Sequence, residues 1–161
     1  MEIKVIDIEK EKDDNVIVGQ ANFSIFTTDD LYTSLITAAP NISVGVAMNE
    51  AEPKLVRANS NNDRLGQLAS KNALKIGASH VFVIFIEKAF PINVLQTIKN
   101  VAGVCNIYVA TGNKTQIIIG ETELGRAVLG AVDGTAVNKI ENNEDKKQRR
   151  DLVKKIGYSL P

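Results

Sequence analysis

Hydrophobic and polar residues alternate along the chain with two different periods, which together predict strands and helices. Apolar residues between positions 3 and 8 and again at 16–18 flank a charged segment, and this pattern predicts a β-hairpin with a polar tip. The run VFVIFIE at 81–87 is unbroken, which is typical of a strand buried on both faces. Further apolar runs predict strands at 41–50, 54–58, 104–110, 115–121 and 126–134.

Helical spacing predicts four helices between these strands. Thr27 and Asp30 have the spacing of a capping box, which starts a helix that ends at Pro40. A second helix covers 61–77, with Gly77 as the left-handed residue past its end, and a third follows Pro91. Residues 149–158 predict a short amphipathic helix. About eight strands and four helices in mixed order predict one compact α/β domain over residues 1–161, a layered α+β arrangement with a mixed sheet.

Charge and composition narrow the partners. The 19 basic residues equal the 19 acidic ones, so no basic stripe indicates nucleic acid or anionic lipid as a partner. The N-terminus lacks the features of a signal peptide and the longest apolar run is six residues, so we expect a cytoplasmic protein with a small-molecule ligand. The single cysteine, Cys105, lies in an apolar run and is predicted to be buried.

Common catalytic motifs are missing from the sequence. Gly125 and Gly130 have the spacing of a Walker loop, but Ala131 and Val132 stand where that loop needs Lys and Ser or Thr. The chain has no GxGxxG, GxSxG or HExxH motif, and its single histidine excludes a site built from several histidines.

A group of charged residues is bracketed by glycines between positions 120 and 134. Arg126 is suited to bind phosphate oxygens, while Glu121 or Asp133 could hold a ribose hydroxyl or Mg²⁺. The alternative is that residues 122–126 are a hairpin tip with solvated charges and Asp133 begins a turn. Spacing alone leaves both interpretations open.

His80 is the only histidine and stands directly before the buried strand. It could be a packed residue at a strand edge, or a nucleophile or base whose ring is oriented by a carboxylate from Glu50, Glu121 or Asp133. Similarly, Phe90, Pro91 and Asn93 open a helix, where free N–H groups bind anions, although ordinary capping explains them equally well.

The sequence resembles the adenosine-specific kinase family of archaea and bacteria. The resemblance rests on residues 72–111, on ETELGRAVLGAVDG at 121–134 and on RRDLVKKIGY at 149–158. It implies a trimer-forming α/β domain that binds adenosine or AMP and is phosphorylated on a histidine, for which His80 is the candidate. The loops at 49–57 and 110–115 depart from the family pattern, so ligand preference could differ.

The resulting prediction is phosphoryl transfer to adenosine through a phosphohistidine, with ATP or another phosphate donor and Mg²⁺ as expected cofactors. The rival hypotheses are a non-catalytic sensor of AMP or adenosine and a purely structural oligomer. The predicted catalytic residues are His80, Glu121, Arg126 and Asp133. The predicted nucleotide-binding residues are Glu50, Ser79, Phe90, Pro91, Asn93, Gly125, Gly130 and Gly134.

Overall fold

Eight strands and four helices form the part of the chain that the computed structural model describes, residues 1–157. The strands are β1 (Glu2–Asp7), β2 (Asn15–Ala21), β3 (Ser43–Asn49), β4 (Val56–Ser60), β5 (Val81–Glu87), β6 (Val104–Thr111), β7 (Thr115–Glu121) and β8 (Arg126–Asp133). The helices are α1 (Ser24–Ile36), α2 (Asp63–Ile76), α3 (Pro91–Lys99) and α4 (Asn143–Lys155). The predicted α/β class is therefore confirmed, and position 158 of the last predicted helix lies outside the described residues.

The strands form two sheets. The larger has the order β4-β3-β5-β2-β6 and the smaller the order β1-β7-β8. Every pairing in both is antiparallel, so the expectation of a mixed sheet was wrong. The unbroken apolar run of β5 suggested a parallel neighbour, but an antiparallel strand also loses its alternation when both of its faces are covered.

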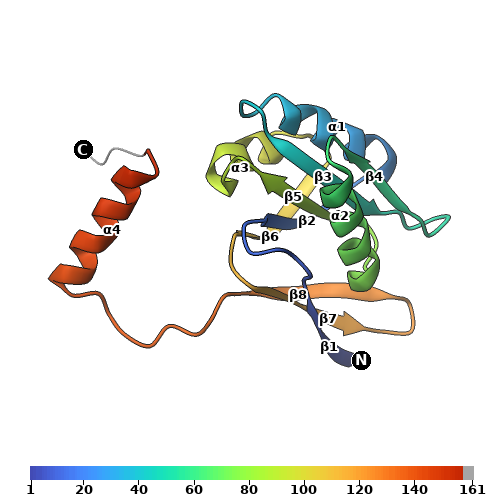
Figure 1. The fold of residues 1–161 in the computed structure, drawn as a ribbon. Helices are drawn as coiled ribbons and strands as arrows, with labels where there is room; N and C mark the ends of the chain where they lie inside the picture. The colour runs from blue at the N-terminus through green and yellow to red at the C-terminus, as the bar shows by residue number, and fades with distance from the viewer. Residues whose placement is uncertain (158–161) are drawn as a thin grey trace.

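Two apolar cores lie on opposite faces of the larger sheet (Figure 1). On one face, Phe82, Ile84 and Ile86 of β5 pack with residues of α1 and α3. On the other, Val81, Val83 and Phe85 pack with α2 and with the inner face of the smaller sheet. As predicted, β5 is buried on both faces.

The ends of α2 match their predicted signals. The side chain of Asn62 accepts a hydrogen bond from the backbone N–H of Leu65, and Gly77 ends the helix with φ of 64°. Pro91 is the first residue of α3, and Asn93 Oδ1 accepts a hydrogen bond from the backbone N–H of Phe90. The capping box at Thr27 was wrong, because α1 begins a turn earlier and Thr27 is buried.

The predicted hairpin of the first two strands does not form. β2 pairs with β5 and β6 in the larger sheet, whereas β1 pairs with β7 in the smaller one. The pairing of β7 with β8 has a bulge, which leaves Leu129 without a partner across the strand. Two strands that are neighbours in sequence thus serve different sheets.

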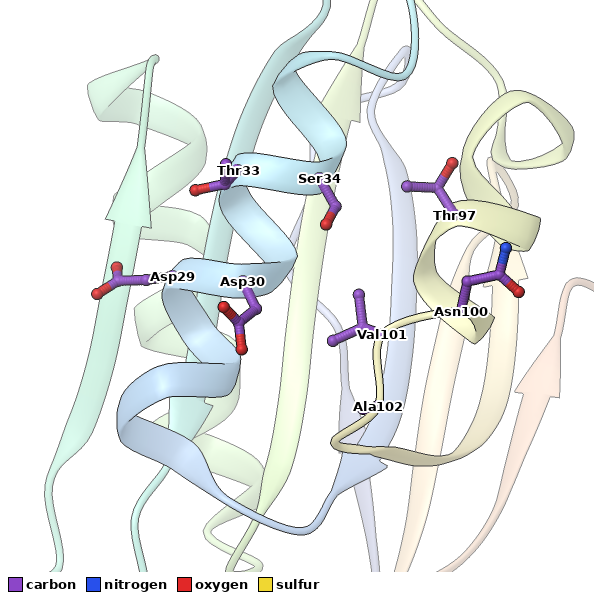
Figure 2. Close-up of a pocket in the computed structure, with 8 residues that line it drawn as sticks. All are labelled: Asp29, Asp30, Thr33, Ser34, Thr97, Asn100, Val101 and Ala102. Carbon is purple, nitrogen blue, oxygen red and sulfur yellow. The ribbon is translucent and has the colours of Figure 1, made fainter.

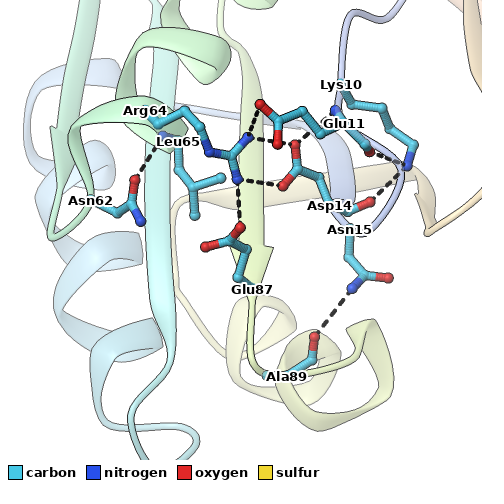
Figure 3. A network of polar contacts seen from close by, with 9 residues as sticks. All are labelled: Lys10, Glu11, Asp14, Asn15, Asn62, Arg64, Leu65, Glu87 and Ala89. Carbon is cyan, nitrogen blue, oxygen red and sulfur yellow. Dashed lines mark hydrogen bonds and ion pairs between the residues drawn. The ribbon is translucent and has the colours of Figure 1, made fainter.

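A buried ion-pair network fastens the β1–β2 connection to the larger sheet (Figure 3). Arg64 at the start of α2 binds both carboxylate oxygens of Asp14, at 2.9 and 2.6 Å, and also Glu87 at 2.6 Å. Asp14 is 1% exposed. Burial alone would raise the pKa of Asp14, but the hydrogen bonds from Arg64 and the Glu11 backbone outweigh it and lower this pKa overall.

A second ion-pair group predicts acid sensitivity. Glu9 pairs with Lys71 and Lys75 of α2, and their hydrogen bonds lower the pKa of Glu9 from 4.5 to about 2. A carboxylate whose pKa is depressed on folding stabilises the fold above its unfolded pKa. We therefore expect the free energy of unfolding in urea to fall as pH drops from 4.5 towards 2, and Glu9→Gln to flatten this part of the profile. An unchanged profile in Glu9→Gln would contradict the assignment.

Two further observations bear on the sequence predictions. Cys105 is exposed, contrary to expectation, because β6 is an edge strand of the larger sheet. Among the helices of residues 1–157, none has the length and hydrophobicity required to cross a membrane.

Candidate functional site

A cavity of about 650 Å³ opens between the end of α2, the β3–β4 loop and the β7–β8 turn. Glu50, Lys54 and Leu55 come from the β3–β4 loop, and Leu74 and Gly77 from the end of α2. The β7–β8 turn contributes all of residues 121–126. Five of the predicted site residues line this one cavity: Glu50, Ser79, Glu121, Gly125 and Arg126.

Arg126 and Glu121 face each other across the first residue pair of β8 and β7. Arg126 Nε lies 3.3 Å from Glu121 Oε2, and the same oxygen accepts a hydrogen bond from Lys4 Nζ at 2.5 Å. The hydrogen bond from Lys4, followed by the charge of Arg126, lowers the pKa of Glu121, while partial burial opposes this. Glu121 is therefore ionised at neutral pH and holds both cations at the wall of the cavity.

The C-terminus of α2 also positions Arg126. Arg126 Nη1 donates to the carbonyl oxygens of Lys75 and Ile76, at 3.3 and 3.5 Å. These carbonyls have no partner within the helix and carry its partial negative charge, which favours a guanidinium. The same nitrogen would lie 3.0 Å from a Cβ on Gly77, whose φ is already left-handed, so glycine suits this position twice over.

Glu50 is the buried carboxylate of the site. It follows β3, and its Oε2 accepts a 2.6 Å hydrogen bond from Arg57 Nε of β4. The Glu50 backbone N–H donates to the carbonyl of Leu55, which closes the β3–β4 loop. This pairing leaves the second oxygen of Glu50 as an acceptor facing the cavity region.

Three leucines give the cavity an apolar rim. Leu55, Leu74 and Leu124 come from three different segments and are 47%, 68% and 100% exposed. Exposed leucines gathered at the mouth of a polar cavity offer a surface on which a flat apolar ring can lie.

His80 stands at the border of the cavity rather than in its lining. It follows the lining residue Ser79 and precedes β5, as predicted. Its backbone N–H donates to Asn49 and its carbonyl accepts from Ala21, so the residue bridges β3 and β2. Its imidazole is half-buried and makes no hydrogen bond or ion pair within residues 1–157.

The backbone of His80 is left-handed, with φ of 60°. Such a conformation costs a non-glycine residue free energy and is tolerated best by Asn, Asp and His. Glycine would satisfy the backbone at lower cost, so the side chain at this position is a candidate for function.

The remaining predicted residues lie apart from the cavity. Asp133 and Gly134 are at the opposite end of β8 from Arg126, where Asp133 accepts a hydrogen bond from Asn113. Gly130 lies between them, and Phe90, Pro91 and Asn93 open α3 on the other face of the larger sheet. The sequence could not show this separation, because it depends on the length and register of β8.

Sequence reasoning also missed residues that build the site. Lys4, Arg57 and the three rim leucines were not singled out, since each belongs to a segment that reads as ordinary strand, helix or turn. The only local signal was the abundance of charge between positions 121 and 126.

A second cavity, of about 500 Å³, lies between α1 and the end of α3 (Figure 2). Its charged residues are Asp29 and Asp30, and its lining contains no lysine or arginine. Asp29 points away from α3 in Figure 2 and accepts a hydrogen bond from Asn59. A cavity of this charge does not favour a phosphate, so the first cavity is the better candidate for a nucleotide site.

The predicted Mg²⁺ finds no protein-built site in the described chain. Residues 1–157 contain no group of three His, Cys, Asp or Glu side chains placed to hold a metal ion. The Glu50 and Glu121 carboxylates are instead engaged by Arg57 and by Lys4 with Arg126. The residues present therefore do not fit a resident Mg²⁺.

Comparison with known proteins places this fold and cavity in a family. The chain is similar to the PH1918 protein from Pyrococcus horikoshii OT3, whose crystal structure matches with a TM-score of 0.96 and 59% sequence identity over 99% of each chain. A search of curated proteins found no match. The family model described as adenosine specific kinase matches residues 6–159, nearly the whole sequence. The chain therefore belongs to the adenosine-specific kinase family.

Proposed function

We propose that this chain binds adenosine or AMP in the cavity beside α2 and transfers a phosphoryl group to adenosine through His80. The observation that carries the proposal is the divided lining of that cavity, with an apolar rim on one side and paired charges on the other. A nucleoside has the same division, because its base is flat and apolar on both faces while its sugar carries hydroxyls. Membership of the adenosine-specific kinase family supports adenine as the base.

Each part of the ligand has a matching group in the cavity. The base would lie against Leu74 and Leu124, and the ribose hydroxyls would donate to the Glu50 carboxylate. Arg126 would bind the 5′ phosphate of AMP, since a guanidinium matches the geometry of phosphate oxygens. The β3–β4 loop, which departs from the family pattern, lines the cavity, so base or sugar preference is open to change there.

The chemistry proposed for His80 proceeds in two displacements. The imidazole nitrogen that carries no proton attacks the terminal phosphorus of a nucleoside triphosphate, forming an N–P bond as the P–O bond to the nucleoside diphosphate breaks. The adenosine 5′ oxygen then attacks this phosphorus and releases its proton to solvent. The N–P bond breaks and its electron pair returns to the ring.

The test is incubation of the protein with γ-labelled ATP, compared with the His80→Asn variant. Asparagine tolerates the left-handed backbone of position 80, so this variant removes the imidazole without the strain that alanine would introduce. We expect acid-labile label on the wild-type protein and none on His80→Asn, with a thermal shift by AMP in both. Label that persists in His80→Asn would contradict the role of His80.

A non-catalytic sensor of AMP or adenosine is the second candidate. It is favoured by the position of His80, whose neighbour Ser79 lines the cavity while His80 does not. A thermal shift by AMP without any protein-bound label would support the sensor. Thermal shifts absent for adenosine, AMP and ATP alike would contradict both candidates.

A further inference from the structure

The C-terminal segment of the chain is an arm that leaves the rest of the molecule (Figure 1). This arm, residues 135–157, consists of an extended stretch followed by α4, in which no residue is buried. Its apolar residues Val137 and Ile140 are more than 90% exposed, and Leu152 and Ile156 are 59% and 45% exposed. The ion pairs Lys139–Asp145 and Glu141–Arg149 form within the arm itself.

Leu152 and Ile156 lie on one side of α4, because residues four apart in a helix are neighbours on its surface. A helix that buries nothing gains its stability only from caps and local pairs, and helices of this length are marginal in water on that basis. The capping box of Asn142 with Asp145 supplies part of that stability. The apolar side of α4 is therefore a surface for which residues 1–157 of the same chain provide no cover.

A second uncovered surface is the outer face of the β1-β7-β8 sheet. The inner face packs into the core through Ile117, Ile119 and Val128. Residues of opposite register point outward, and Leu129 covers Gly120 on that side. The outer face consists of Ile3, Val5, Ile118, Leu129 and Val132, of which Ile3, Val5 and Leu129 are more than half exposed. An antiparallel sheet with a solvated face ordinarily carries polar residues there.

The arm and the remainder of the chain have opposite charges. Residues 135–157 contain seven Lys or Arg and four Asp or Glu, a net charge of +3. The whole chain is neutral, so residues 1–134 carry −3. Asp7 and Asp133 lie together at one end of the β1-β7-β8 sheet and give that end an acidic border. Opposite net charges favour docking of an arm on the body of another molecule.

We propose that the arm of one copy docks on the outer face of the β1-β7-β8 sheet of a second copy, with Leu152 and Ile156 against Val5 and Leu129. The arm begins where β8 ends and continues away from its own sheet, so its own outer face lies behind it (Figure 1). The eight residues 135–142 span up to about 28 Å when extended, which is sufficient to reach a neighbouring molecule. This interaction does not depend on the proposed phosphoryl transfer.

The first test measures the assembly of the full-length protein by size-exclusion chromatography with light scattering. We expect the wild type to exceed the mass of one chain. The double variant Leu152→Asp with Ile156→Asp, and separately Val5→Asp, should raise the concentration at half dissociation by at least about tenfold. All of these positions are exposed, and a thermal melt by circular dichroism checks that each variant is folded.

The matched control is Ile92→Asp on α3. Ile92 is 64% exposed, similar to the test positions, and lies on the opposite side of the larger sheet from the outer face. This variant should assemble like the wild type. A wild type that remains a single chain at about 100 µM, or assembly that survives the arm variants, would overturn the proposal.

The second test identifies the two contacting surfaces. In a Cys105→Ser background, protein carrying Ile156→Cys is mixed with protein carrying Leu129→Cys and oxidised, and disulfide-linked pairs are separated without reductant. We expect the mixed pair to form at least about tenfold more than the pair of Ile156→Cys with Ile92→Cys, because proximity sets the rate of disulfide formation. Equal yields from both combinations would exclude docking of the arm on the outer face.

Discussion

Gly45→Ala should lower the free energy of unfolding by at least about 3 kcal/mol, as measured by urea denaturation. A Cβ at position 45 would lie 2.2 Å from the carbonyl carbon of Leu65 and 2.3 Å from its oxygen. Both atoms belong to the backbone of α2 and have no rotamer by which to move away. The helix must therefore lift from the sheet, which opens the core that Leu65 and Ala69 fill.

Gly130→Ala is the control for this change. A Cβ at position 130 meets no atom within 4 Å and the backbone φ is not left-handed, so alanine should change the unfolding midpoint little. A Gly45→Ala protein with the stability of Gly130→Ala would show that α2 can move off β3 at negligible cost, contrary to the expected result.

Arg126→Gln should weaken AMP binding by about tenfold to a hundredfold while changing adenosine binding by less than about threefold. Only AMP carries the phosphate that the guanidinium is proposed to bind. The glutamine amide can still donate to the carbonyls at the end of α2, so the fold around the cavity should persist. Isothermal titration with both ligands measures the ratio.

Arg150→Gln removes an equal charge from the exposed surface of α4 and should leave the affinities for both ligands unchanged. Equal losses of AMP and adenosine affinity in Arg126→Gln would place the guanidinium at the nucleoside instead. No loss for either ligand would remove Arg126 from the site.

Local signals predicted the parts of the fold that local physics determines. Gly77 and Pro91 mark helix ends because their backbone preferences act within a turn, and the apolar run of β5 is continuous because both of its sides are covered. The pairing of β1 was missed because its partner, β7, lies more than 100 residues away. Cys105 was predicted buried because the apolar run around it does not reveal that β6 is an edge strand.

The candidate site was predicted in part for the same reason. Glu121, Gly125 and Arg126 were found because they are close together in the sequence, on one turn. Lys4 and Arg57 complete the charge pairs from distant strands, and no pattern in their own segments distinguishes them from solvated charges. Asp133 was grouped with Arg126 by sequence distance, although an extended strand separates them.

The bulge at Leu129 decides which direction Arg126 faces. In a regular strand, alternate residues share a side, so with Ala131 packed in the core the residues on that side would be 129 and 127, and Arg126 would point to solvent. One additional residue reverses the parity, and Val128 and Arg126 share the inner side with Ala131. The cation in the cavity thus depends on a single-residue insertion in β8, and deletion of Leu129 would turn it outward without altering any residue of the site itself.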